Sequence, residues 1–114
     1  KGNFGENLAA TYLIKKGYKI RERNFVFERA EVDIIAEKDN FLIVVEVKTR
    51  ASELFETATE LVTSRQVKQI ITATEGYIHL MDIDLETRFD VIAIILDERP
   101  PKIEHIEGAF YPTL

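Results

Sequence analysis

The segment Phe41–Arg50 constrains the fold more than any other part of the chain, because it is a dense apolar run that one carboxylate, Glu46, interrupts. Strands with such runs are typical of a sheet that is covered on both faces. A second apolar run, Phe89–Leu96, follows a long amphipathic segment. Because a strand, helix and strand passage favours a right-handed parallel crossover, the sequence predicts an α/β protein with a mixed sheet flanked by helices.

Apolar alternation and apolar runs between turn residues predict five strands, at residues 18–27, 30–36, 41–49, 89–96 and 102–106. Helical periodicity predicts a first helix over residues 3–16. A second helix begins behind a capping-box pattern, Thr63 to Gln66, and runs to about Leu80. Residues 50–60 are small and acidic, and we expect a mobile loop there.

The length of 114 residues suits one domain, residues 1–114, and is too short for two. The chain has no cysteine, which excludes disulfides and thiolate zinc sites, and no apolar run approaches the roughly 20 residues of a membrane span. The formal net charge is −5, although residues 1–50 carry ten basic and eight acidic side chains. We therefore expect a cytoplasmic protein that does not associate with membranes and has a local basic surface at most. Because the chain begins at Lys1, we expect a few residues to precede it.

Asp33, Glu46 and Lys48 form the candidate site that the strands suggest. An ionised carboxylate such as Glu46 is costly inside an apolar strand unless a cation or hydrogen bonds compensate its charge. Side chains two residues apart share a face, so Glu46 and Lys48 point the same way. Mg²⁺ and Mn²⁺ prefer oxygen ligands, and two carboxylates on adjacent strands can supply them. An ordinary salt bridge between Glu46 and Lys48 explains the same spacing.

Glu6 is a third candidate carboxylate, because it shares a helical face with Ala9, Ala10 and Leu13. That face should pack inward, and Glu6 could then reach the strand carboxylates and hold a water molecule. The alternative is that Glu6 lies in the first helical turn and only favours the helix dipole.

Motifs along nearly the whole chain carry a resemblance to a known family. They are Gly5-Glu6 with Ala9 and Leu13, Gly17-Tyr18, Arg23-Asn24, Glu31-Val-Asp-Ile-Ile-Ala36, Val45-Glu-Val-Lys-Thr-Arg50, Arg88-Phe-Asp-Val91 and Ile103-Glu-His-Ile-Glu-Gly-Ala-Phe110. In this order and at these intervals, the sequence resembles the YraN-like family of small bacterial proteins. That family is similar to the PD-(D/E)XK nucleases, which include archaeal Holliday junction resolvases and restriction endonucleases.

The resemblance implies a single-domain αβββαβ core of the restriction-endonuclease type. It also implies an endonuclease that hydrolyses DNA phosphodiester bonds with Mg²⁺ or Mn²⁺, with branched or single-stranded DNA as candidate substrates and a homodimer as a candidate assembly. Asp33, Glu46 and the backbone carbonyl of Val47 would hold the metal. Lys48 would be the third catalytic residue, and Glu6 would lie beside them.

Three further residues, Arg50, Gln66 and Lys68, are candidates for substrate binding by the same resemblance. The sequence departs from the family pattern at Ala30, where a glycine is usual, and at Gln66, where a lysine is usual. Related nucleases often use a glutamine in this region, but capping of the second helix explains Gln66 equally well.

The rival interpretation is a non-catalytic module of the same fold that binds nucleic acid or a protein. Retention of all three residue types at Asp33, Glu46 and Lys48 favours the enzyme, whereas the acidic balance favours the module. A hydrolase of a small phosphate ester is a third interpretation, which a deep closed pocket would support.

Overall fold

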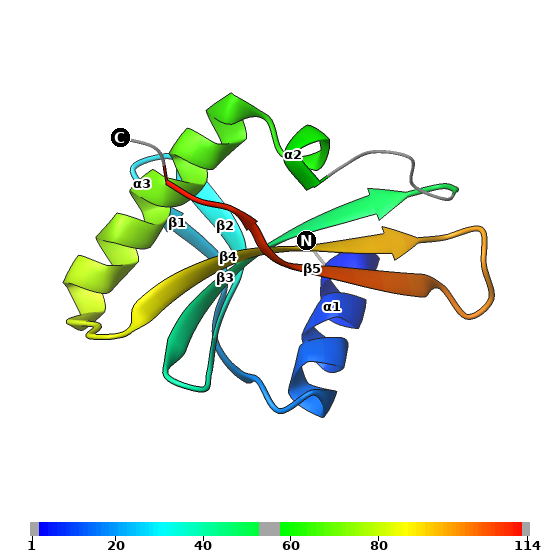
Figure 1. The fold of residues 1–114 in the computed structure, drawn as a ribbon, viewed down its shortest axis with the longest axis horizontal. Coiled ribbons are helices and arrows are strands. Elements are labelled where there is room, and N and C mark those ends of the chain that lie inside the picture. Colours follow the sequence, from blue (N-terminus) through cyan, green and yellow to red (C-terminus); the bar gives the residue numbers. More distant parts are fainter. Residues whose placement is uncertain (1–2, 53–57, 113–114) are drawn as a thin grey trace.

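A computed structural model describes residues 3–52 and 58–112 of the chain. The elements in chain order are α1 (Phe4–Lys15), β1 (Lys19–Phe27), β2 (Ala30–Lys38), β3 (Phe41–Arg50), α2 (Ala58–Leu61), α3 (Ser64–Met81), β4 (Glu86–Ile95) and β5 (Lys102–Phe110). Figure 1 shows this order, with a single twisted sheet between α1 and α3. The expected αβββαβ order is confirmed, with α2 and β5 in addition.

The five strands lie in the order of the sequence, β1-β2-β3-β4-β5. Neighbouring strands are antiparallel except β3 and β4, which are parallel from Phe41↔Glu86 to Arg50↔Ile95. The chain between these two strands passes through α3, so the predicted parallel crossover and the mixed sheet are confirmed.

Both faces of the sheet are covered, which explains why the central strands are apolar throughout. One face packs against α1, where Ala9 and Leu13 meet Ile34, Ile43 and other side chains. The opposite face packs against α3. The residues of this second cluster include Val32, Ile35, Leu42, Val44, Ile70, Ala73, Tyr77 and Val91. The helices α1 and α3 therefore hold the sheet from opposite sides (Figure 1).

Local chemistry fixes the ends of the predicted elements. The Thr63 hydroxyl accepts a hydrogen bond from the Gln66 N–H at 3.1 Å, and the Gln66 side chain accepts one from the Thr63 N–H at 3.0 Å. This is the predicted capping box, and it starts α3. Asp39 and Asn40 have φ of 52° and 67°, the left-handed pair that a two-residue hairpin needs between β2 and β3.

Two expectations need correction. The last strand extends from Lys102 to Phe110 instead of ending at residue 106, because Phe110 still pairs with Phe89 and stacks on its ring at 5.1 Å. The expected mobile loop over residues 50–60 is also too long, since Arg50 ends β3 and Ala58–Leu61 is helical. The remainder of that loop includes residues 53–57, which lie outside the described part of the chain.

A close approach joins α3 to the sheet at Gly76. A methyl group at this position would overlap the ring of Phe27, so only glycine lets the helix lie this near β1. Within the described residues, no helix is both long and apolar enough to cross a membrane.

Candidate functional site

Asp33 lies where β2 and β3 separate. The pairing of these strands ends at Ile34↔Val45, and beyond it the Asp33 Oδ2 accepts a hydrogen bond of 2.8 Å from the Val47 N–H. Val32 packs under α3 whereas Ile34 packs under α1, although residues two apart in a regular strand share a face. The alternation of β2 therefore breaks at Asp33, and its carboxylate points to the edge of β3.

Glu46 and Lys48 lie next to this fork on β3. The Lys48 Nζ is 3.4 Å from the Glu46 Oε2, and the two side chains are only 13% and 16% exposed. Val44, two residues before Glu46, packs in the cluster under α3, so regular alternation directs Glu46 and Lys48 to that face. Glu46 and Lys48 therefore share a face of β3, as expected, and they also form the salt bridge that was the alternative explanation of their spacing.

Burial and neighbouring carboxylates raise the cost of ionising Asp33 and Glu46. Burial, and then the charge of Glu46, raise the pKa of Asp33 to about 8, although the Val47 N–H opposes this. Burial also raises the pKa of Glu46, while Lys48 lowers it in part. A protonated Asp33 can donate a hydrogen bond to Glu46, and this bond favours the ionised form of Glu46.

Glu6 faces the same region from the first turn of α1. Glu6 is 8% exposed. Its backbone N–H donates a hydrogen bond of 3.0 Å to the side chain of Asn3, the residue that caps α1. Glu6 and Asp33 line one pocket of about 370 Å³, together with Asn3, Asn24 and Glu31. Glu6 thus has the place in the first turn that suits the helix dipole and also the inward direction that the sequence suggested.

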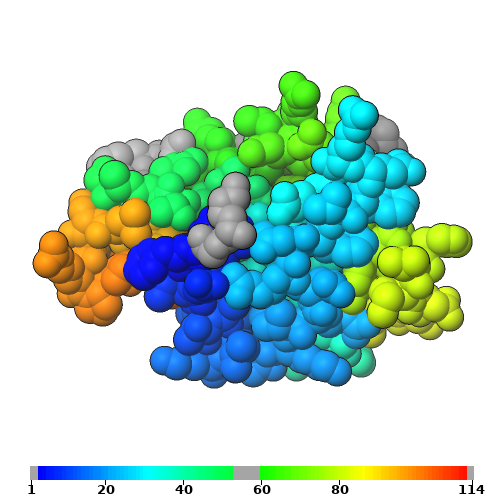
Figure 2. All heavy atoms as spheres, turned by 180° about the vertical axis from the view of Figure 1, so that it is seen from behind, coloured from blue at the N-terminus to red at the C-terminus, as the bar shows by residue number. Residues whose placement is uncertain are grey.

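The approach of α1 to this region depends on Gly5. A methyl group there would lie 2.5 Å from the Thr49 Oγ1 on β3, so a side chain at position 5 would push the helix start away from the strand. The space-filling view of Figure 2 shows the start of α1 in dark blue beside the β1 and β2 region in light blue. The pocket residues come from these same segments.

The donor set fits a hydrated Mg²⁺ or Mn²⁺. Two half-buried carboxylates on adjacent strands, whose ionisation burial disfavours, are a place where a divalent cation would lower the electrostatic cost. Across residues 3–52 and 58–112, no three acidic or histidine side chains gather closely enough to form a metal centre by themselves. Mg²⁺ commonly binds through one or two carboxylates and keeps several waters, so Asp33 and Glu46 satisfy its requirement.

The three residues expected to bind substrate are not brought into the pocket of Asp33. Gln66 is engaged in the capping box, which is the alternative that the sequence left open. Lys68 is exposed and lines a separate surface pocket of about 190 Å³ with Arg29 and four other residues. Arg50 donates to the Thr49 carbonyl at 3.0 Å, at the end of β3.

Sequence reasoning assigned no role to Asn3, Asn24 or Glu31, although all three line the pocket. Glu31 and Asp33 are two residues apart, so their spacing alone could have suggested a shared face. The Asn24 amide lies 2.9 Å from Glu6 and 3.2 Å from Glu31. Only the motif Arg23-Asn24 marked it in the sequence.

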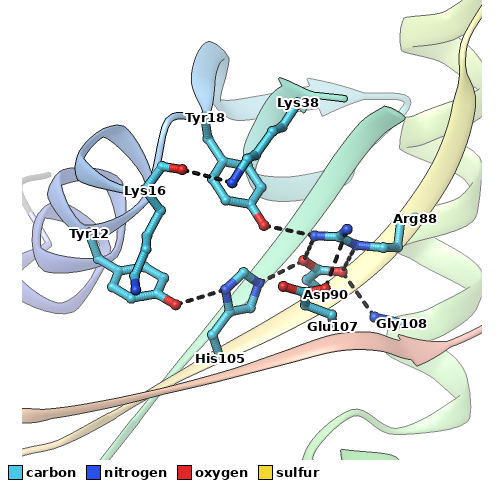
Figure 3. A network of polar contacts seen from close by, with 9 residues as sticks. All are labelled: Tyr12, Lys16, Tyr18, Lys38, Arg88, Asp90, His105, Glu107 and Gly108. Carbon is cyan, nitrogen blue, oxygen red and sulfur yellow. Dashed lines mark hydrogen bonds and ion pairs between the residues drawn. The ribbon is translucent and has the colours of Figure 1, made fainter. Parts of the chain in front are cut away.

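A second polar network lies on the α1 face of β4 and β5 (Figure 3). The fully buried Asp90 accepts two hydrogen bonds from Arg88, at 2.9 and 2.8 Å, and one from the His105 Nε2 at 2.7 Å. The His105 Nδ1 contacts the Tyr12 hydroxyl at 3.1 Å, and Arg88 donates to the Tyr18 hydroxyl at 2.9 Å. These contacts tie α1 and the residue before β1 to β4 and β5.

The network also settles the charge of Asp90. Burial acts to raise its pKa, but the hydrogen bonds from His105, Arg88 and the Gly108 N–H outweigh burial and hold the pKa of Asp90 below its usual range. Asp90 is therefore ionised and fully compensated, unlike Asp33. This contrast marks Asp90 as a structural carboxylate and Asp33 as one whose negative charge is poorly compensated by its neighbours.

The fold and the site together define an α/β protein whose mixed sheet carries two half-buried carboxylates and a lysine at a strand fork. The chain belongs to the family described as "Uncharacterised protein family UPF0102", which it matches over residues 5–94. This confirms the resemblance to the YraN-like family. The matched range contains Glu6, Asp33, Glu46 and Lys48.

Relatives of this family cover nearly the whole chain. The UPF0102 protein FP2501 of Flavobacterium psychrophilum is 46% identical over 110 residues, which span 96% of this chain and 92% of the relative. A UPF0102 protein of Phocaeicola vulgatus is 46% identical over 113 residues, with 99% and 93% covered. A UPF0102 protein of Bacteroides thetaiotaomicron is 43% identical, with the same coverage.

Proposed function

We propose that this protein is a metal-dependent endonuclease that hydrolyses phosphodiester bonds of DNA. The observation that carries the proposal is the pair Asp33 and Glu46, two half-buried carboxylates on adjacent strands, with the Lys48 Nζ 3.4 Å from the Glu46 Oε2. Family membership supports it through the similarity of the YraN-like family to PD-(D/E)XK nucleases.

The residues that would hold Mg²⁺ or Mn²⁺ are Asp33, Glu46 and the backbone carbonyl of Val47. When bound, such a cation polarises the scissile phosphate and lowers the pKa of a coordinated water. The Val47 N–H keeps one Asp33 oxygen fixed at the strand edge, which leaves the other oxygen available for a ligand. The carboxylates are thereby oriented before substrate arrives, and little reorganisation remains for the reaction.

Lys48 supplies the positive charge beside these carboxylates. Its ammonium group, held near Glu46 and largely buried, orients the attacking water and stabilises the negative charge that develops on the phosphate. Glu6, which lines the pocket with Asp33, would accept a hydrogen bond from a water molecule there. Each of these roles requires a side chain that is held in place, which burial and hydrogen bonds provide here.

The test is cleavage of labelled linear, single-stranded and four-way-junction DNA in Mg²⁺ or Mn²⁺. We expect metal-dependent cleavage by the wild type and its loss in Asp33→Ala and in Glu46→Ala, with the fold retained by circular dichroism. The preferred substrate would define the substrate class. Cleavage at the wild-type rate by a variant that carries both Asp33→Ala and Glu46→Ala would contradict the assignment of these residues.

The second candidate function is a binding module without turnover. The acidic net charge of −5 and the pocket carboxylates Glu6 and Glu31 favour a module that binds a protein, because DNA binding usually relies on basic contacts. A folded protein that binds the metal and cleaves none of the three substrates would support this candidate, and salt-sensitive binding of DNA would identify nucleic acid as its ligand.

A further inference from the structure

We infer that Asn24 is a positioning residue that holds the Glu6 carboxylate in the pocket beside Asp33. This inference rests on the proposed nuclease function for its catalytic consequence. The contact between Asn24 and Glu6 can be tested without any activity.

The backbone of Asn24 is unusual for a residue inside a strand. Asn24 lies within β1 but has φ of 53°, in the left-handed region. Most residues with a side chain disfavour this conformation, and asparagine is among the few that adopt it routinely. Strain of this kind persists where the surrounding structure imposes it, often at functional sites.

The register of the sheet places this irregular residue opposite Asp33. The strands β1 and β2 pair at Arg23↔Ile34 and again at Phe25↔Val32, so Asn24 and Asp33 occupy the intervening positions. The alternation of β2 also breaks at Asp33. Both strands thus depart from regular geometry at the same level, and the side chains of both residues reach the pocket.

The Asn24 amide provides hydrogens to two carboxylates. Its Nδ2 donates to the Glu6 Oε1 at 2.9 Å and to the Glu31 Oε2 at 3.2 Å. An amide nitrogen carries two hydrogens and no charge, so it can satisfy two acceptors without cancelling the negative field of the pocket. A lysine or arginine here would pair with the carboxylates and compete with a cation.

Glu6 has no comparably short alternative in Arg23. The Arg23 guanidinium is 3.9 Å from the Glu6 Oε1, and it donates to the Asn7 side chain at 2.8 Å. The position of the Glu6 carboxylate in the pocket therefore depends on the amide of Asn24. Without that donor, Glu6 is free to turn toward Arg23 and away from the water that it is proposed to hold.

Two substitutions separate this role from a structural one. Asn24→Gly removes the amide but suits a left-handed backbone, so the fold is expected to persist. Asn24→Asp keeps the shape and also tolerates the conformation, but it replaces both hydrogens with a third negative charge. Asn40→Gly is the matched control, because Asn40 has φ of 67° in the β2–β3 turn, outside the pocket.

The activity measurement is DNA cleavage as a function of substrate and of Mg²⁺ concentration. We expect Asn24→Gly to lower kcat by about 10–100-fold with KM for DNA little changed, the usual scale for partners that orient a catalytic ligand. Asn24→Asp should lose at least as much, and Asn40→Gly should match the wild type. A wild-type kcat in Asn24→Gly, in a chain that cleaves DNA, overturns the catalytic consequence of Asn24.

The contact itself is read from the side-chain carboxyl of Glu6 by ¹³C NMR. We expect its chemical shift to move in Asn24→Gly and in Asn24→Asp, and to stay at the wild-type value in Asn40→Gly. An unchanged shift in both Asn24 variants overturns the positioning role, whether or not the protein cleaves DNA. A wild type that cleaves none of the DNA substrates, with a moved Glu6 shift, instead overturns the nuclease proposal and leaves the contact established.

Discussion

The Asp33 carboxylate accepts a hydrogen bond of 2.8 Å from the Val47 N–H, at the point where β2 and β3 stop pairing. It thus replaces the backbone acceptor that Val47 would have in a continuous pair of strands. The carboxylate is thereby fixed at the edge of β3 beside Glu46. Two carboxylates in this position are costly without a cation, and this cost makes the account testable even before a substrate is known.

Asp33 should make the metal-free protein less stable at alkaline pH. Its pKa in the folded state is about 8, above its ordinary value, so the folded state binds the extra proton between these two pH values. The Asp33 contribution to stability therefore falls as the pH rises toward 8. We expect Asp33→Asn to be more stable than the wild type at pH 9 by at least about 1.4 kcal/mol, the equivalent of one pKa unit. Urea unfolding in EDTA at pH 6 and pH 9 measures this difference, and equal stability at pH 9 would contradict it.

Mg²⁺ and Mn²⁺ should stabilise the wild type. A ligand that binds only the folded state adds about 2.7 kcal/mol at a concentration of 100 times Kd. We expect Tm at pH 8 to rise with either cation and to rise much less in Asp33→Asn and Glu46→Gln. Thermal unfolding with matched ionic strength in KCl is the control. A Tm that does not respond in the wild type would argue against the metal site.

Asp90 should have the opposite dependence on pH. Its pKa is held below the usual range, so its contribution is full at neutral pH and is lost as the pH falls through the folded-state pKa. Asp90→Asn leaves Arg88 with a neutral partner, and we expect a loss of about 3–5 kcal/mol at pH 7. The loss should shrink at pH 3. Urea unfolding at both pH values tests this, and a loss that does not depend on pH would be inconsistent with a charged Asp90.

Gly76→Ala should destabilise the fold although alanine favours helices. The added methyl group would overlap the ring of Phe27, and overpacking of this kind costs about 1–3 kcal/mol. Phe27→Leu in the same chain should recover part of the loss, because a smaller side chain then faces position 76. Denaturant unfolding of the single and double variants measures both effects. A stabilising Gly76→Ala would show that α3 can move away from β1 at little cost.

Much of the fold follows from periodicity. The strands around Ile43 and Ile92 are apolar because helices cover both faces of the sheet, and their apolar runs in the sequence predict this burial. The end of β5 could not be read in the same way, because Glu107 and Gly108 resemble a turn. In the structure the Gly108 N–H donates to the buried Asp90, and the strand continues past it.

The candidate site likewise contains residues whose proximity the sequence predicts and residues whose proximity it does not. Glu46 and Lys48 share a face because they are two residues apart on one strand, so their proximity is visible in the sequence. The place of Asp33 depends on where β2 and β3 separate, and the place of Asn24 depends on a left-handed residue inside a strand. Both are set by pairing between strands, which local patterns do not encode.

The most direct test of the central claim is hydrolysis of the preferred DNA substrate by the wild type and by Glu46→Gln, each with Mg²⁺ and with EDTA. Glu46→Gln keeps the shape of the side chain and removes its negative charge. The account predicts Mg²⁺-dependent cleavage by the wild type and a loss of at least about 100-fold in the variant, the scale of one electrostatic catalytic group. Equal cleavage by the two proteins, or cleavage that persists in EDTA, would contradict the assignment of Asp33 and Glu46 as the metal-binding centre of a nuclease.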